Sequence, residues 1–153
     1  MFIGRERELK KLNSLYHTDI FQFPVIYGRR RVGKTALINE FIRGKDAISF
    51  TGIESTASQN LENLSHAIHR YIGSVGEAPI YSSFQAALEA IFQLSENKRL
   101  IFSIDEYPYL AKAYKPFSSV LQKLIDKYKD NSQLYLILCG SSMSFMEEQV
   151  LGY

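Results

Sequence analysis

The chain has 153 residues, of which 46% are hydrophobic and 22% are charged, and its formal net charge is +2. This composition is typical of a globular protein, and the 10 Tyr and 10 Phe argue against a disordered segment. The small net charge does not by itself indicate nucleic-acid binding, and no run of about 18 apolar residues predicts a membrane span. The lone Cys139 cannot form an internal disulfide, so we expect a cytoplasmic domain with no membrane partner.

Hydrophobic periodicity predicts helices that alternate with short buried strands. Apolar residues at helical spacing mark the helices, and short apolar runs mark the strands. The helix over residues 61–72 has Asn60 as its candidate N-cap. In chain order, the predicted elements are a helix over 6–16, a strand over 23–27, a helix over 35–42, a strand over 47–51, helices over 61–72 and 83–94, a strand over 100–104, a helix over 116–128 and a strand over 134–139.

This alternation predicts an α/β fold with a mainly parallel sheet that helices cover on both faces. Crossover connections between parallel strands are then right-handed. Ligands of such sheets bind beyond the carboxyl ends of the strands. The polar residues that follow each strand are therefore the candidates for chemistry.

A phosphate-binding loop follows the first predicted strand. Residues 28–35 match the pattern G-x-x-x-x-G-K-[ST] at every defined position. Glycines let successive backbone N–H groups turn toward a phosphate, and the positive end of the next helix favours the same anion. We expect Lys34 to reach the β- and γ-phosphates of ATP and the Thr35 hydroxyl to coordinate Mg²⁺. The predicted nucleotide-binding residues are Gly28, Arg29, Arg30, Arg31, Val32, Gly33, Lys34, Thr35 and Ala36, and the three arginines are interpreted as an exposed tip without a catalytic role.

An acidic pair ends the third predicted strand. Asp105 follows four largely apolar residues, and we expect it to hold Mg²⁺ through the ion's water shell. Glu106 is placed to polarise a water molecule for attack on the γ-phosphate. Tyr107 and Tyr109 could stack on a base or on a partner's ring, but packing over the sheet edge is the favoured interpretation.

Hydroxyl side chains follow two other strands. Ser141, and as second choice Ser142, is a candidate sensor of the γ-phosphate, with an ordinary turn or a helix N-cap as the equal alternative. Thr51 is a candidate for holding Glu106 in an idle rotamer. Cys139 lies in an apolar strand and is expected to be buried and inert.

Together these segments resemble the ATPases of the AAA+ and STAND-like groups. Residues 28–35, Ile104-Asp105-Glu106 and residues 137–142 resemble their Walker A, Walker B and sensor 1 elements, and residues 2–9 are similar to the segment that borders the adenine. More narrowly, G-R-R-R-V-G-K-T with D-E-Y-P-Y-L and C-G-S-S resembles the archaeal-type ATPase family, also found in bacteria. The resemblance implies a three-layer α/β/α P-loop core in which another strand separates the Walker A and Walker B strands.

The resemblance also implies that residues 1–153 form an incomplete ATPase core. A fifth core strand, a helical lid with a sensor 2 residue, and any winged-helix or nuclease-like region are expected beyond Tyr153. Members of such groups act on an attached or partner effector, so a homo-oligomer or a downstream effector domain is the expected partner.

Several alternatives remain beside ATP hydrolysis. A GTPase would need Asn-Lys-x-Asp, but Leu100 stands where the Asp belongs after Asn97 and Lys98. A small-molecule kinase is less favoured, because Glu106 beside Asp105 suits water as the nucleophile. A regulatory nucleotide switch with negligible turnover and a DNA-associated module stay open, and the modest net charge predicts little DNA binding.

Overall fold

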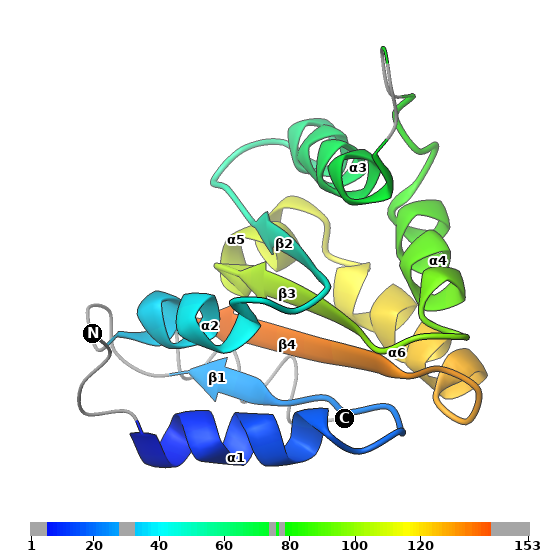
Figure 1. Ribbon diagram of the computed structural model, residues 1–153. Helices are drawn as coiled ribbons and strands as arrows, with labels where there is room; N and C mark the ends of the chain where they lie inside the picture. The colour runs from blue at the N-terminus through cyan, green and yellow to red at the C-terminus, as the bar shows by residue number, and fades with distance from the viewer. Residues whose placement is uncertain (1–5, 28–32, 74–75, 77–78, 142–153) are drawn as a thin grey trace.

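The computed structural model describes residues 6–27, 33–73, 76 and 79–141. Within these residues, four strands alternate with six helices (Figure 1). The elements in chain order are α1 (Glu6–Tyr16), β1 (Val25–Tyr27), α2 (Lys34–Ile42), β2 (Ala47–Thr51), α3 (Ala57–Ile72), α4 (Phe84–Leu94), β3 (Leu100–Asp105), α5 (Tyr107–Ala113), α6 (Phe117–Tyr128) and β4 (Leu134–Gly140). No helix of this described part has the length and apolar character that a bilayer span needs.

The four strands form one parallel sheet in the order β1-β4-β3-β2. Strand β4 therefore separates β1, which precedes the phosphate-loop sequence, from β3, which carries the acidic pair. This is the strand placement that the family resemblance implies. The register sets Tyr27 beside Gly140 and Thr51 beside Asp105, so the strands end together at one edge of the sheet.

Helices cover both faces of the sheet, which confirms the predicted three-layer α/β/α architecture (Figure 1). Alternate residues of the central strands point to opposite faces, and both central strands are almost wholly buried. One apolar cluster joins α1 and α2 to Ile101, Tyr135 and Ile137. A larger cluster joins α3, α4, α5 and α6 to the other face.

The helix that follows β2 starts earlier than predicted. Thr56 is its N-cap, with a side-chain oxygen that accepts a hydrogen bond from Gln59 N–H at 3.0 Å. Asn60 is therefore not the cap but lies inside the first turn, where its side chain is fully buried. The same helix ends with Ile72 49% exposed, so this residue does not continue the apolar face as the periodicity predicts.

A short helix, α5, directly follows the acidic pair and was absent from the predicted elements. Pro108 lies in its first turn, where a missing N–H group leaves no hydrogen bond unmade. Tyr107 is fully buried against Phe117, so it packs in the core and cannot stack on a base. Strand β1 is two residues shorter than predicted, because it begins at Val25 after Pro24.

Arg99 ties α1 to the amino-terminal edge of the sheet. Its guanidinium lies over the rings of Tyr16 and Tyr135 at 5.7 and 5.2 Å. Because a helix leaves its last carbonyls without partners inside the helix, this side chain supplies donors to the end of α1 and to the loop that follows it. Its hydrogen bonds reach the carbonyl oxygens of Tyr16 (3.0 Å), Ile20 (2.7 Å), Gln133 (2.8 Å) and Leu15 (2.9 Å) and the Thr18 hydroxyl (3.3 Å).

Replacing Arg99 by alanine is expected to lower the free energy of unfolding by about 2–4 kcal/mol, because several carbonyls lose a charged donor together. Urea unfolding followed by circular dichroism measures this loss. Arg43→Ala is the matched control: the Arg43 side chain is 77% exposed and forms a surface ion pair with Glu40, so about 0.5 kcal/mol or less is expected. Equal losses in the two variants would contradict the role of Arg99.

Candidate functional site

The candidate site lies at the carboxyl edge of the sheet, where the chain leaves β1 and β3 on opposite faces. Helix α2 follows β1 on one face, and α5 follows β3 on the other face (Figure 1). In open parallel sheets, ligands bind beyond this edge. Gly33, the N-cap of α2, has a φ of 83°, a conformation that favours glycine. The first helical residue, Lys34, is only 7% exposed, so it is a buried cationic residue at the N-terminus of α2.

Thr35 and Asp105 come together across this edge. The Thr35 hydroxyl donates a hydrogen bond of 2.8 Å to Asp105 Oδ2, although 70 residues separate them in sequence. Both are hard oxygen donors beside a helix N-terminus, and Mg²⁺ in nucleotide sites takes one or two such protein ligands. The two residues predicted to hold the metal ion thus fit it in chemistry and in position.

The second oxygen of Asp105 is also engaged. Asp105 Oδ1 accepts a hydrogen bond of 2.9 Å from the backbone N–H of Glu106. The carboxylate is therefore oriented from both sides, by its sequence neighbour and by the helix that follows the phosphate loop. Such preorganisation lowers the cost of forming a metal or phosphate site.

Glu106 and Ser141 approach each other from neighbouring strands. The Ser141 hydroxyl lies 3.5 Å from Glu106 Oε1, at the long limit for a hydrogen bond. Thr51 ends β2 beside Asp105, but within the described part of the chain no hydrogen bond joins it to Glu106. The hydroxyl that lies near the Glu106 carboxylate thus belongs to Ser141, which directly follows β4, and the idle-rotamer hypothesis for Thr51 has no contact to support it here.

Cys139 lies directly under this site and is fully buried, as predicted. Burial, and secondarily the nearby Asp105 carboxylate, raise the pKa of the Cys139 thiol well above its ordinary value. The thiol therefore stays protonated and unreactive at neutral pH.

Part of the predicted site lies outside the described residues. Residues 28–32, with the first glycine, the three arginines and Val32, belong to this part, as do Ser142 and residues 2–5. Of the predicted phosphate-binding set, the described residues are Gly33, Lys34, Thr35 and Ala36. Phosphate contacts of the loop, and the roles of the catalytic candidates, stay predictions.

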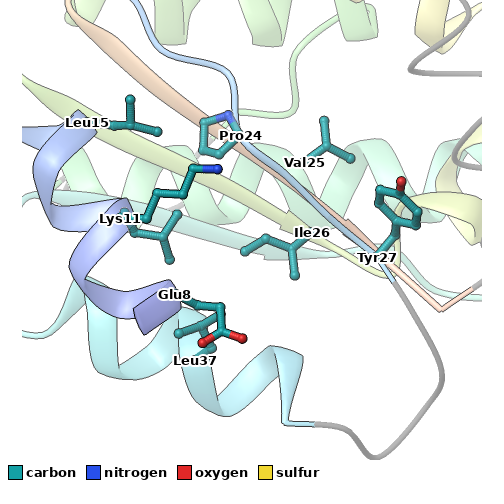
Figure 2. Close-up of a pocket in the computed structure, with 9 residues that line it drawn as sticks. Glu8, Lys11, Leu15, Pro24, Val25, Ile26, Tyr27 and Leu37 are labelled. Atoms are coloured by element: carbon teal, nitrogen blue, oxygen red, sulfur yellow. The ribbon is translucent and has the colours of Figure 1, made fainter. Parts of the chain in front are cut away.

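A groove of about 480 Å³ lies beside the site, between α1 and β1 (Figure 2). Apolar side chains form its floor, and Glu8 and Lys11 of α1 stand along one side. It extends to Tyr27, the last residue before the phosphate-loop sequence, and to Leu37 of α2. Thr35, Asp105 and Glu106 are not among the described residues that line it.

The family model of an ATPase domain found predominantly in Archaea matches residues 2–152. An uncharacterized protein of Methanocaldococcus jannaschii is 37% identical over 153 residues, which cover 100% of this chain and 32% of that protein. An uncharacterized ATP-binding protein of the same organism is 42% identical over 45 residues, 29% of this chain and 76% of that protein. The chain therefore spans about a third of the longer relative.

Solved structures share the fold. A Walker-type ATPase of Pyrococcus abyssi has a TM-score of 0.71 at 19% identity, over 98% of this chain and 48% of that one. The Cdc6 protein of Pyrobaculum aerophilum has a TM-score of 0.69 at 16% identity, over 99% and 42%. The Orc1 protein of Aeropyrum pernix, solved in complex with DNA, has a TM-score of 0.71 at 18% identity, over 99% and 42%. With a matching family model, a parallel P-loop sheet and the Thr35–Asp105 pair at its edge, the chain belongs to the family of ATPase domains found predominantly in Archaea.

Proposed function

We propose that this chain binds ATP with Mg²⁺ and hydrolyses it, and that hydrolysis drives a conformational change in an attached or partner effector. The observation that carries the proposal is the 2.8 Å contact between Thr35 and Asp105. It brings the end of the phosphate-loop sequence and the acidic strand to one point, where a phosphate-bound metal ion would need both.

Each residue has a defined role in this proposal. Lys34 binds the β- and γ-phosphates, and Thr35 and Asp105 hold Mg²⁺, which neutralises phosphate charge when bound. Glu106 orients and polarises the attacking water. Ser141, in contact with Glu106, responds to the γ-phosphate.

Hydrolysis is favoured over phosphoryl transfer to another substrate by the surroundings of Glu106. The residue next to the metal-binding carboxylate is a second carboxylate, close to the sheet edge and partly exposed. A carboxylate in that place can accept a proton from water without a further substrate. The alternative, a nucleotide switch with little turnover, requires the same binding residues but gives no role to Glu106.

The metal role of Asp105 is tested by replacing it with asparagine, which keeps the shape and removes the charge. The gain in ATP affinity on adding Mg²⁺ is expected to fall at least about tenfold, or about 1.4 kcal/mol. Isothermal titration with ATP, with and without Mg²⁺, measures it. Asp126→Asn on the exposed side of α6 is the matched control and is expected to leave the gain unchanged. A full Mg²⁺ response in the Asp105 variant would refute the assignment.

The effector on which ATP hydrolysis acts is also a proposal. The chain spans 32% of its Methanocaldococcus jannaschii relative, and the effector is proposed for the whole protein and not for these 153 residues. The Orc1 protein of Aeropyrum pernix was solved with DNA, but at 18% identity it shares the fold alone. Self-association and DNA association of this chain are therefore separate hypotheses, and salt-dependent retention on DNA would test the latter.

A further inference from the structure

The backbone of Glu106 adopts an uncommon conformation. Its φ is 55°, and it is the only residue other than glycine with a positive φ in the described part of the chain. A left-handed backbone costs a side-chain-bearing residue roughly 1–2 kcal/mol. Such a residue persists only where its surroundings hold it in place. The same conformation begins α5, because Glu106 O accepts a hydrogen bond of 3.1 Å from Tyr109 N–H.

The turn after β2 lies directly against Glu106. Gly52 N–H donates a hydrogen bond of 2.8 Å to Asp105 O, which extends the pairing of β2 and β3 by one residue. A Cβ atom on Gly52 would lie 2.8 Å from Glu106 O, 3.1 Å from Leu110 Cβ and 3.2 Å from Leu110 N. The nearest of these atoms belongs to the backbone, so it cannot move aside as a flexible side chain would. No side chain fits at Gly52 unless the Glu106 peptide shifts.

Asn60 holds the turn that follows β2 in place through hydrogen bonds. Its fully buried side chain accepts a hydrogen bond from Ile53 N–H at 3.0 Å and donates to Ile53 O at 3.2 Å and to Thr56 O at 3.0 Å. Three hydrogen bonds to one side chain thus fix Ile53 and Thr56, which lie near the two ends of the turn over residues 52–56. A buried amide that meets backbone donors and acceptors in this way defines a single conformation.

We propose that the turn over residues 52–56, anchored by Asn60, is a rigid support that fixes the orientation of the Glu106 carboxylate for hydrolysis. Gly52 and Asn60 are then positioning residues: they contact no substrate and act through the Asp105–Glu106 backbone. This inference rests on the proposed hydrolytic role of Glu106. It predicts that a small displacement at Gly52 reduces turnover and spares nucleotide binding. Lys34 and Thr35 lie on α2, which packs on the other face of the sheet from α5.

Gly52→Ala tests the support, and Gly44→Ala is its matched control. Gly44 has a φ of 77° and open space around it, so alanine there strains the backbone but meets no atom within 4 Å. It also lies beyond the far end of α2 from the site. Single-turnover hydrolysis of ATP is expected to slow roughly tenfold or more in Gly52→Ala, with ATP affinity within about threefold of wild type. Gly44→Ala is expected to keep the wild-type rate within about twofold. Equal rates in wild type and Gly52→Ala, or equal slowing in both variants, would overturn the inference.

The double variant Gly52→Ala/Glu106→Gln separates this inference from the proposed function. If Gly52 acts only through Glu106, its substitution has no further effect once the carboxylate is gone. An undiminished slowing in the Glu106→Gln background would overturn the inference. If Glu106→Gln alone left hydrolysis unchanged, the proposed function would fail first, and the inference with it.

Amide exchange gives a readout that needs no turnover. The Tyr109 N–H, which is bonded to Glu106 O, is expected to exchange at least about fivefold faster in Gly52→Ala than in wild type, as measured by NMR. Asn60→Ala is expected to have the same effect, because it releases the turn. Gly44→Ala should leave Tyr109 exchange unchanged. Unchanged exchange in Gly52→Ala, or equal acceleration in the Gly44 control, would overturn the inference.

Discussion

Lys34→Ala is expected to weaken ATP binding by about 100-fold or more, the largest effect on affinity of any single substitution proposed for this chain. Lys34 is 7% exposed at the first position of α2, the helix N-terminus to which we propose that the phosphates bind. A charge-assisted contact in a partly desolvated place is worth about 2–3 kcal/mol, and 2.7 kcal/mol corresponds to the 100-fold loss.

The measurement is isothermal titration of the chain with ATP and Mg²⁺. Lys123→Ala on the exposed face of α6 has the same change of charge far from the site, and its affinity is expected to equal that of wild type. Circular dichroism of both variants checks that the fold is kept. Equal ATP affinity in wild type and Lys34→Ala would contradict a phosphate site at this helix.

Glu106→Gln is expected to slow hydrolysis by about 100- to 1,000-fold while ATP affinity stays within about threefold. The amide has nearly the same shape as the carboxylate but cannot accept a proton from water, and general base catalysis contributes about 10²–10⁴-fold. Because the left-handed backbone and the contacts of Asp105 do not involve the lost charge, the Thr35–Asp105 hydrogen bond is expected to survive.

Phosphate release under saturating ATP and Mg²⁺ measures this effect. Glu96→Gln is the control, since Glu96 is exposed between α4 and the start of β3, at the opposite edge of the sheet from Glu106. Unaltered hydrolysis in Glu106→Gln would exclude its role as the base. Absence of hydrolysis in the wild-type protein, with and without an effector, would favour the nucleotide-switch alternative.

The sheet and the meeting of Thr35 with Asp105 could be predicted from the sequence. Strands that alternate with helices along the chain form a parallel sheet. The carboxyl ends of parallel strands lie at one edge of the sheet, independently of the loops that connect them. The strand over residues 47–51 was predicted with its observed limits, and the buried state of Cys139 followed from its apolar neighbours. Local patterns were sufficient for these features.

The supporting contacts could not be predicted in the same way. Asn60 was interpreted as a helix cap because Asn favours that position, but its partners are backbone groups of the turn before the helix. Gly52 has no room for a side chain because Glu106 O, 54 residues later in the sequence, lies against it. A local sequence pattern cannot predict a contact between residues so far apart. The helix after Glu106 was missed because seven residues that include Pro108 carry too few apolar repeats.

Arg99 and the Thr35–Asp105 pair stand at opposite edges of the same sheet. Arg99 precedes β3 and contacts the backbone just before β4, whereas Asp105 ends β3. Inherited or engineered changes at the amino edge would therefore alter how much folded protein a cell accumulates, and leave each folded molecule as competent as before. Changes to the Lys34 or Glu106 side chain at the carboxyl edge would leave abundance nearly constant and alter what each molecule does. A loss of activity in a cell thus has two separable origins in this chain, and a measurement of protein level distinguishes them.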